Sequence, residues 1–170
     1  KETSVEKIFN KKLGGGCILD LGCYPTSLTI LISSLIKNIN YNNPRVKVAE
    51  REIGETGVDV HAKAQIIYDN GFVSEVKASF KEEMENNTII KGKKGEILIK
   101  NTFTGIDEIK VNLGNKNYNI NKKSKKNIYS LEIENISRNI LDGENKVLFP
   151  GMQAYETFLN MKILENWIND

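Results

Sequence analysis

Residues 58–80 read VDVHAKAQIIYDNGFVSEVKASF, and this stretch decides the fold. From Val58 to Tyr68, small and apolar residues alternate with polar ones, which is the period of a strand with one buried face. The turn sequence Asp-Asn-Gly follows at 69–71, and the alternation resumes after it. The stretch therefore predicts an antiparallel β-hairpin.

Two further hairpins are predicted downstream, over residues 88–100 and 106–120, each with glycine at its turn. Consecutive hairpins indicate an antiparallel sheet, because parallel strands need helical crossovers. Apolar residues recur at helical spacing at 28–36 and 129–141, and another helix is expected after Pro150. The predicted fold class is therefore α+β, a large, mostly antiparallel open sheet of about six strands with helices packed on one face.

The opposite face of this sheet is predicted to carry a mixture of charged, polar and apolar side chains. Its members are Lys63, Gln65, Ile67, Val73, Glu75 and Lys77. Such a mixture suits either solvent or a second copy of the chain, and the pattern alone favours neither.

Length and composition are those of one soluble domain spanning residues 1–170. With 24 Lys+Arg against 22 Asp+Glu, the formal net charge is only +2, which excludes a polybasic arm as the main feature. No apolar run approaches the ~20 residues of a membrane span, and the polar start KETSVEKIFNKK is unlike a signal peptide. Two cysteines cannot form a disulfide framework, so a cytoplasmic location is expected. We expect no membrane and no nucleic acid as partner.

The densest group of chemically capable residues lies in GGGCILDLGCYP, residues 14–25. Three consecutive glycines suggest that another group comes very close or that φ is positive. Asp20 and Tyr24 are four residues apart, so on a helix they would share a face with Gly22 between them. A carboxylate beside a phenol can orient the hydroxyl and tune its pKa for proton transfer. The alternative is a capping or surface pair, which is commoner.

Other candidate residues have simpler structural explanations. His61 alternates onto the sheet surface, and no further ligands with metal-site spacing accompany it, so no metal is expected. Cys17 and Cys23 are interpreted as small apolar residues. The lysines of NKKSKKN at 121–127 have no interleaved aromatic residues, which favours a solvated loop over a nucleic-acid site. Asp59 begins a strand, either near a pocket or as a turn cap.

The segment GGGCILDLGCYPTSL resembles the motif that opens the C-terminal domain of the Gfo/Idh/MocA oxidoreductases, especially the branch of dihydrodiol dehydrogenase and glucose–fructose oxidoreductase. That motif has three glycines, three mostly apolar residues, then Asp, Gly and Tyr at alternate positions. The likeness continues through residues 57–80, TIIKGKKGEILI at 88–99, and YSLEIENISRNILDG at 129–143.

The resemblance implies an open-sheet domain like the C-terminal domains of glyceraldehyde-3-phosphate dehydrogenase and dihydrodipicolinate reductase. It implies an NAD(P)-dependent enzyme acting on a sugar, polyol or cyclic diol, with dimerisation through the sheet. Tyr24 would be the catalytic acid/base and Asp20 its catalytic neighbour. Gly14, Gly15 and Gly16 would lie close to substrate and cofactor.

The sequence departs from the family in lacking the N-terminal Rossmann domain. No G-x-G-x-x-G follows a predicted strand, and none of Pro25, Pro44 and Pro150 follows the family's Glu-Lys. We therefore expect a C-terminal substrate-binding and oligomerisation domain that is inactive alone and binds no NAD(P). The competing reading is a non-enzymatic α+β module that uses its open sheet to bind a partner or a second copy.

Overall fold

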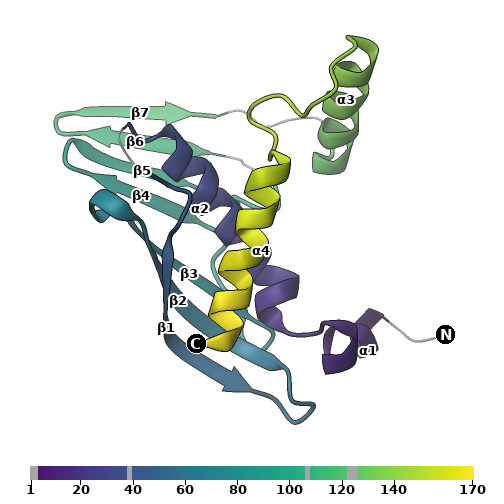
Figure 1. Cartoon of the computed structure of the whole chain (residues 1–170). Helices are drawn as coiled ribbons and strands as arrows, with labels where there is room; N and C mark the ends of the chain where they lie inside the picture. The colour runs from purple at the N-terminus through teal and green to yellow at the C-terminus, as the bar shows by residue number, and fades with distance from the viewer. Residues whose placement is uncertain (1–3, 38–39, 106–107, 122–125) are drawn as a thin grey trace. The chain divides into compact units, whose positions relative to one another are not determined.

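The computed structural model describes residues 4–37, 40–105, 108–121 and 126–170 (Figure 1). It divides into two compact units. We call Lys1–Glu83 together with Leu148–Asp170 the helical unit, and Met84–Val147 the four-stranded unit. Both are α+β, as the sequence predicts.

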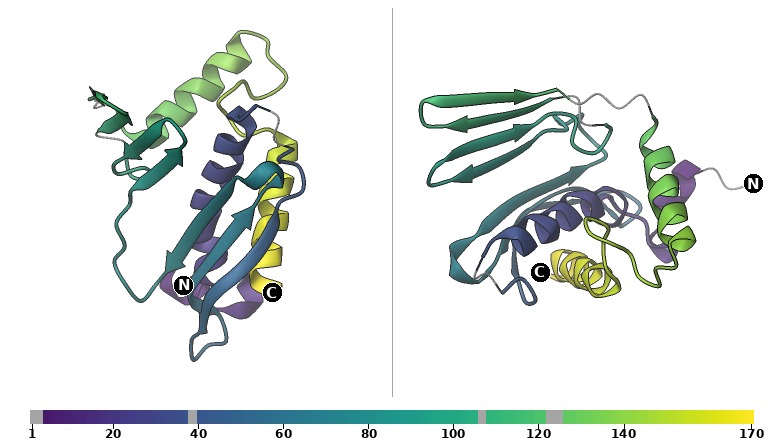
Figure 2. Two further views of the ribbon diagram at one scale, coloured as in Figure 1. Left: turned by 90° about the vertical axis from the view of Figure 1, so that its left-hand side faces the viewer. Right: turned by 90° about the horizontal axis from the view of Figure 1, so that it is seen from above.

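The helical unit contains a three-stranded antiparallel sheet of β1 (Arg45–Ile53), β2 (Asp59–Ile67) and β3 (Val73–Ser79), in that order. Helices α2 (Cys23–Leu35) and α4 (Ala154–Asn169) lie side by side on one face of it (Figure 2). The unit also holds α1 (Ser4–Ile8), η1 (Lys11–Leu13), the π-helical turn η2 (Ile18–Gly22) and η3 (Asp69–Gly71). The hairpin predicted over 58–80 is confirmed as β2 and β3.

The core of this unit lies between β2 and the two helices. Ala62 and Ala64 of β2 are fully buried, and their small side chains let the helices approach the sheet closely. Trp167, Ile163 and Leu159 of α4 fill the space above them. Tyr155 of the same helix is half-exposed and donates a hydrogen bond to the carbonyl of Asn42 at 3.3 Å.

The four-stranded unit contains β4 (Thr88–Gly92), β5 (Gly95–Ile99), β6 (Ile109–Leu113) and β7 (Lys116–Ile120), paired in that order and all antiparallel. Helix α3 (Ile128–Leu141) follows, and the Asn127 side chain caps it by accepting from the Tyr129 amide at 2.8 Å. Both predicted hairpins and the predicted helix are confirmed.

The strands form two hydrogen-bonded sheets, where the sequence suggested one sheet of six. The additional strand is β1, whose alternation is interrupted by irregularities between Val48 and Glu50 and between Glu52 and Ile53. A bulge shifts the phase of side chains, so the sequence shows no clean period there. Ladder pairing also stops between β3 and β4, where the residues are mostly charged and amide side chains.

The stretch Lys11–Leu35 is long and apolar enough to cross a membrane by length and composition. It is not one uniform helix, because it passes from η1 through a glycine turn to η2 and α2. Residues Ile18, Thr26 and Ile30 within it are buried in the helical unit. The same pattern is found in a core helix, so this stretch is weak support for a membrane span.

Candidate functional site

The three glycines form a tight turn that carries the chain from η1 into η2. Gly14 has φ of +73° and Gly16 has φ of +125°, conformations that side chains disfavour. A Cβ on Gly15 would lie 2.5 Å from the carbonyl oxygen of Ile8, and one on Gly16 would lie 2.5 Å from a carboxylate oxygen of Asp59. The groups that approach this patch so closely therefore belong to the chain itself.

Asp59 is the first residue of β2, and its side chain binds the start of the π-helical turn. Its side chain is only 6% exposed, and its Oδ1 accepts a hydrogen bond from the Ile18 amide at 3.1 Å. Burial raises the pKa of this carboxyl, while the Ile18 hydrogen bond and the charge of Arg51 oppose the shift. Of the two roles that the sequence left open for Asp59, the structure shows the cap.

The raised pKa of Asp59 predicts a specific pH dependence of stability. The contribution of Asp59 is full below its unfolded pKa, where the carboxyl is neutral, and is lost as the pH rises through the raised folded pKa. Asp59→Asn stays neutral, so its free energy of unfolding should rise relative to the parent between about pH 4 and about pH 7. Urea denaturation at both pH values measures this, and a constant difference would contradict it.

Asp20 and Tyr24 lie where the π-helical turn meets α2. Asp20 is exposed and Tyr24 is 51% exposed, so both can meet a molecule in solution. Pro25, which has no backbone N–H to donate, stands in the first turn of α2, directly after the π-helical turn. Single π-helical turns within helices are common at functional sites, because the wider turn changes where its side chains point.

Gly22, which lies between Asp20 and Tyr24 in the sequence, packs against the core. It is buried against the ring of Trp167. A Cβ at this position would lie 3.0 Å from Cζ3 of that ring. The close packing of a glycine on an indole therefore fixes the underside of the turn.

Asn160 of α4 holds the other end of the turn, and sequence reasoning missed it. Its Nδ2 donates to the carbonyl of Cys23 at 3.3 Å, and its Oδ1 accepts from the Thr26 hydroxyl. Asn160 is 8% exposed and Thr26 fully buried. A polar residue within the apolar face of the closing helix was the available signal, since buried amides need partners.

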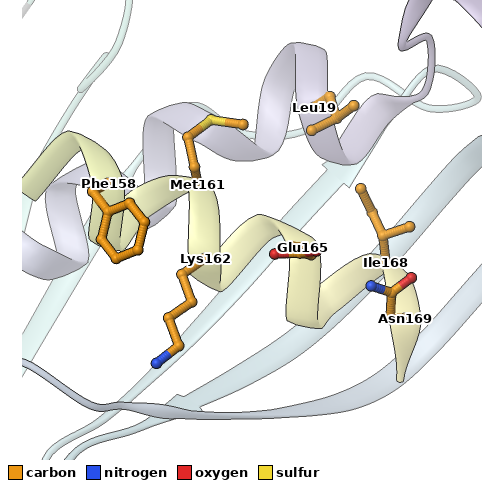
Figure 3. A pocket seen from close by; sticks show the side chains of 7 residues that line it. All are labelled: Leu19, Phe158, Met161, Lys162, Glu165, Ile168 and Asn169. Atoms are coloured by element: carbon orange, nitrogen blue, oxygen red, sulfur yellow. The ribbon is translucent and has the colours of Figure 1, made fainter.

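A groove of about 540 Å³ runs along the outer side of α4 (Figure 3). Six of its lining residues belong to α4, and Leu19 of η2 completes it. They are Phe158, Met161, Lys162, Glu165, Ile168 and Asn169. Because α4 carries apolar residues on its outer as well as its inner side, the helical period used to predict its core face did not reveal this groove.

The other candidate residues occupy structural positions. His61 lies on the open face of β2, with its ring nitrogens 3.5 Å from Glu50 and 3.3 Å from Glu82. Burial raises the pKa of Cys17 to about 12, so its thiol is unreactive near neutral pH. In the part of the chain that the structure describes, no group of three His, Cys, Asp or Glu residues could hold a metal ion.

The lysines at 122, 123 and 125 lie outside the described residues. Lys126, the last of that run, forms an ion pair with Glu134 of α3. This ion pair supports a local structural role for Lys126.

The glycine turn does not fit the phosphates of NAD(P). A dinucleotide-binding turn presents free amides at a helix N-terminus to an anion. Here the Gly15 and Gly16 amides donate to the carbonyls of Asn10 and Ile8 at 3.0 and 2.8 Å, and the Ile18 amide is taken by Asp59. A carboxylate in the position of the anion would repel a phosphate.

Comparisons with known proteins agree on one family. A family model for the GFO/IDH/MocA C-terminal domain matches residues 2–98. The trans-1,2-dihydrobenzene-1,2-diol dehydrogenase of Xenopus laevis is 29% identical over 96 residues, which are 56% of this chain and 27% of that protein. Its counterpart in Xenopus tropicalis is 28% identical over 108 residues, 64% of this chain and 31% of that protein. The chain thus spans about a third or less of these relatives.

Solved structures share the fold at low sequence identity. The aldose–aldose oxidoreductase of Caulobacter crescentus, complexed with glycerol, superposes with a TM-score of 0.74 at 17% identity, over 97% of this chain and 48% of that one. A 3-ketoreductase from Actinomadura kijaniata, in complex with NADP and TDP-benzene, gives 0.71 at 14% identity, over 96% and 48%. The match of the family model to more than half of the residues shows that the chain belongs to the GFO/IDH/MocA C-terminal domain family.

Proposed function

We propose that this chain is the substrate-binding C-terminal part of a cytoplasmic NAD(P)-dependent oxidoreductase, which interconverts a secondary alcohol and a carbonyl on a sugar, polyol or cyclic diol. The observation that carries the proposal is the solvent exposure of Asp20, on the π-helical turn, and of Tyr24, in the first turn of α2, where buried groups fix the backbone on either side. The diol dehydrogenase and sugar oxidoreductase names of the relatives support the substrate class.

Tyr24 is proposed to move the proton of the reaction. Its phenol would donate a proton to the substrate oxygen on reduction and accept one on oxidation, because a phenol is both donor and acceptor. Asp20 would orient the substrate or the phenol by accepting hydrogen bonds. A bound nicotinamide cofactor, whose phosphates the glycine turn does not fit, would supply or accept the hydride. We also propose that Gly14, Gly15 and Gly16 lie near the substrate. The support for this is that they come shortly before Asp20 in the sequence.

Three observations test this function. If the reading frame extends upstream by about 120–150 residues, one Rossmann domain, with G-x-G-x-x-G and Glu-Lys-Pro, the enzyme proposal is supported. The encoded protein should then reduce NADP⁺ or NAD⁺ in the presence of a diol or sugar, followed by absorbance of the reduced nicotinamide. The 170-residue chain alone should not bind NADH in a fluorescence titration, and tight binding would contradict our assignment of the cofactor site.

A non-enzymatic interaction module is the second candidate. It is favoured by the sheet of the four-stranded unit, whose pairing gathers apolar side chains on one face. The cross-strand rows are Ile90–Ile97–Val111–Tyr118 and Thr88–Ile99–Ile109–Ile120. All of these residues are at least partly exposed among the described residues. A reading frame that begins near Lys1 would favour this candidate over the enzyme.

The same apolar face leads us to propose a homodimer formed through the sheet. An exposed apolar face can pack on its own copy about a two-fold axis. Val111→Glu places a charge in the middle of the face and should convert the dimer to a monomer, measured by light scattering after size-exclusion chromatography. Asn112→Glu, on the opposite face of β6, is the matched control and should leave the mass unchanged. A mass that Val111→Glu leaves unaltered would contradict this interface.

A further inference from the structure

The π-helical turn Ile18–Gly22 is held from outside at both of its ends. At the front, Asp59 of β2 accepts from the Ile18 amide at 3.1 Å, across 41 residues of sequence. Next to this contact, the Cys17 thiol donates to the carbonyl of Ala78 on β3 at 3.4 Å. The entry to the turn is thereby tied to two neighbouring strands of the sheet.

At the rear of the turn, Asn160 of α4 donates to the carbonyl of Cys23, the residue before Tyr24, at 3.3 Å. The Thr26 hydroxyl lies within hydrogen-bond distance of the Gly22 carbonyl, at 2.8 Å, and of Asn160 Oδ1, and these two acceptors share its single proton. These contacts satisfy carbonyls at the junction where the π-helical turn becomes α-helix. The exit from the turn is thereby tied to α4.

Neither anchor can reach a substrate directly. Asp59 and Asn160 are 6% and 8% exposed, whereas Asp20 and Tyr24 between them face solvent. A shift of about 1 Å in a reacting group can cost about a hundredfold in rate. Buried polar side chains that fix the backbone on each side of a proton-transfer group are well placed to prevent such a shift.

We infer that Asp59 and Asn160 are positioning residues that set the orientation of Asp20 and Tyr24 by holding the π-helical turn at its two ends. This inference rests on the proposed function for its catalytic consequence. Its structural content, the anchoring of the turn, stands on the contacts alone and can be tested without any activity.

The first experiment measures amide hydrogen exchange by NMR on the 170-residue chain. Asp59→Ala should accelerate exchange of the Ile18 amide by about tenfold, the value of one hydrogen bond. Asp59→Asn keeps an oxygen acceptor and should restore most of the protection. Val76→Ala, a core truncation in β3, is the control for general loss of stability and should leave Ile18 protected relative to the rest of the unit. Equal acceleration in Asp59→Ala and Val76→Ala would overturn the anchor.

The second experiment is a double-mutant cycle in the full-length enzyme. Asp59→Ala and Asn160→Ala should each lower kcat by about tenfold or more with Tyr24 present. In a Tyr24→Phe background each should lower kcat by less than about twofold, because a group that is absent cannot be misplaced. Equal losses in both backgrounds would show a purely structural role and overturn the inference.

Failure of the proposed function and failure of the anchoring of the turn give different results. Unchanged kcat in Tyr24→Phe contradicts the proposed role of Tyr24 and removes the catalytic half of the inference. Unchanged Ile18 exchange in Asp59→Ala contradicts the anchor whatever the activity. Accelerated exchange together with the predicted loss of kcat only where Tyr24 is present supports both.

Discussion

Tyr24→Phe in the full-length enzyme is expected to lower kcat by about 10²–10⁴, the usual contribution of a general acid or base. The ring remains, so substrate binding and the fold of α2 should change little, and KM should stay within about threefold of the parent. Steady-state kinetics with the best diol or sugar substrate measures both constants. The pH profile of kcat should also lose the limb that belongs to Tyr24.

Tyr155→Phe is the matched control for this substitution. Tyr155 is also about half-exposed, and its substitution by Phe also removes one hydroxyl. Tyr155 lies on α4, however, and its hydroxyl donates to the carbonyl of Asn42, away from the π-helical turn. Its kcat should equal that of the parent. If both variants have the same kcat, Tyr24 does not transfer the proton.

Trp167→Ala is expected to give the largest loss of stability in the helical unit. The indole is fully buried, lies in the main cluster and covers Gly22. Removing a core aromatic ring usually costs about 3–5 kcal/mol, because the surroundings do not collapse into the cavity. Urea denaturation followed by circular dichroism measures the change in the free energy of unfolding.

Phe158→Ala provides the comparison on the same helix. Its ring is 66% exposed on the outer side of α4, so its removal should change the free energy of unfolding by less than about 0.5 kcal/mol. Similar losses for Trp167→Ala and Phe158→Ala would show that the helical unit is not organised around the indole.

The elements with short-range signals could be predicted from the sequence. Alternation and a turn tripeptide predicted β2 and β3, and helical spacing predicted α2 and α3, because each pattern reflects one buried face. The strand β1 was harder, since its bulges break the period that identifies a strand. The division into two sheets depends on where ladder hydrogen bonds stop, which no local pattern records.

The candidate site was predictable only in its exposed members. Asp20 and Tyr24 stand in a motif, but their anchors come from distant segments. Asp59 lies 41 residues from the amide it caps, and Asn160 lies 137 residues from the carbonyl it binds. Two roles for Asp59 were open until the fold brought these atoms together. The π-helical turn, too, is held at its ends by tertiary hydrogen bonds to the Ile18 amide and the Cys23 carbonyl, which no local propensity records.

The contact between Gly22 and Trp167 has a consequence for variation among homologues. With a Cβ at position 22 only 3.0 Å from the indole, the two positions share one fixed volume. Lineages that acquire a bulkier residue at 22 should therefore carry a smaller one at 167, and such exchanges should be inherited as a pair. Changes in α4 should thus accompany changes in the π-helical turn that precedes Tyr24.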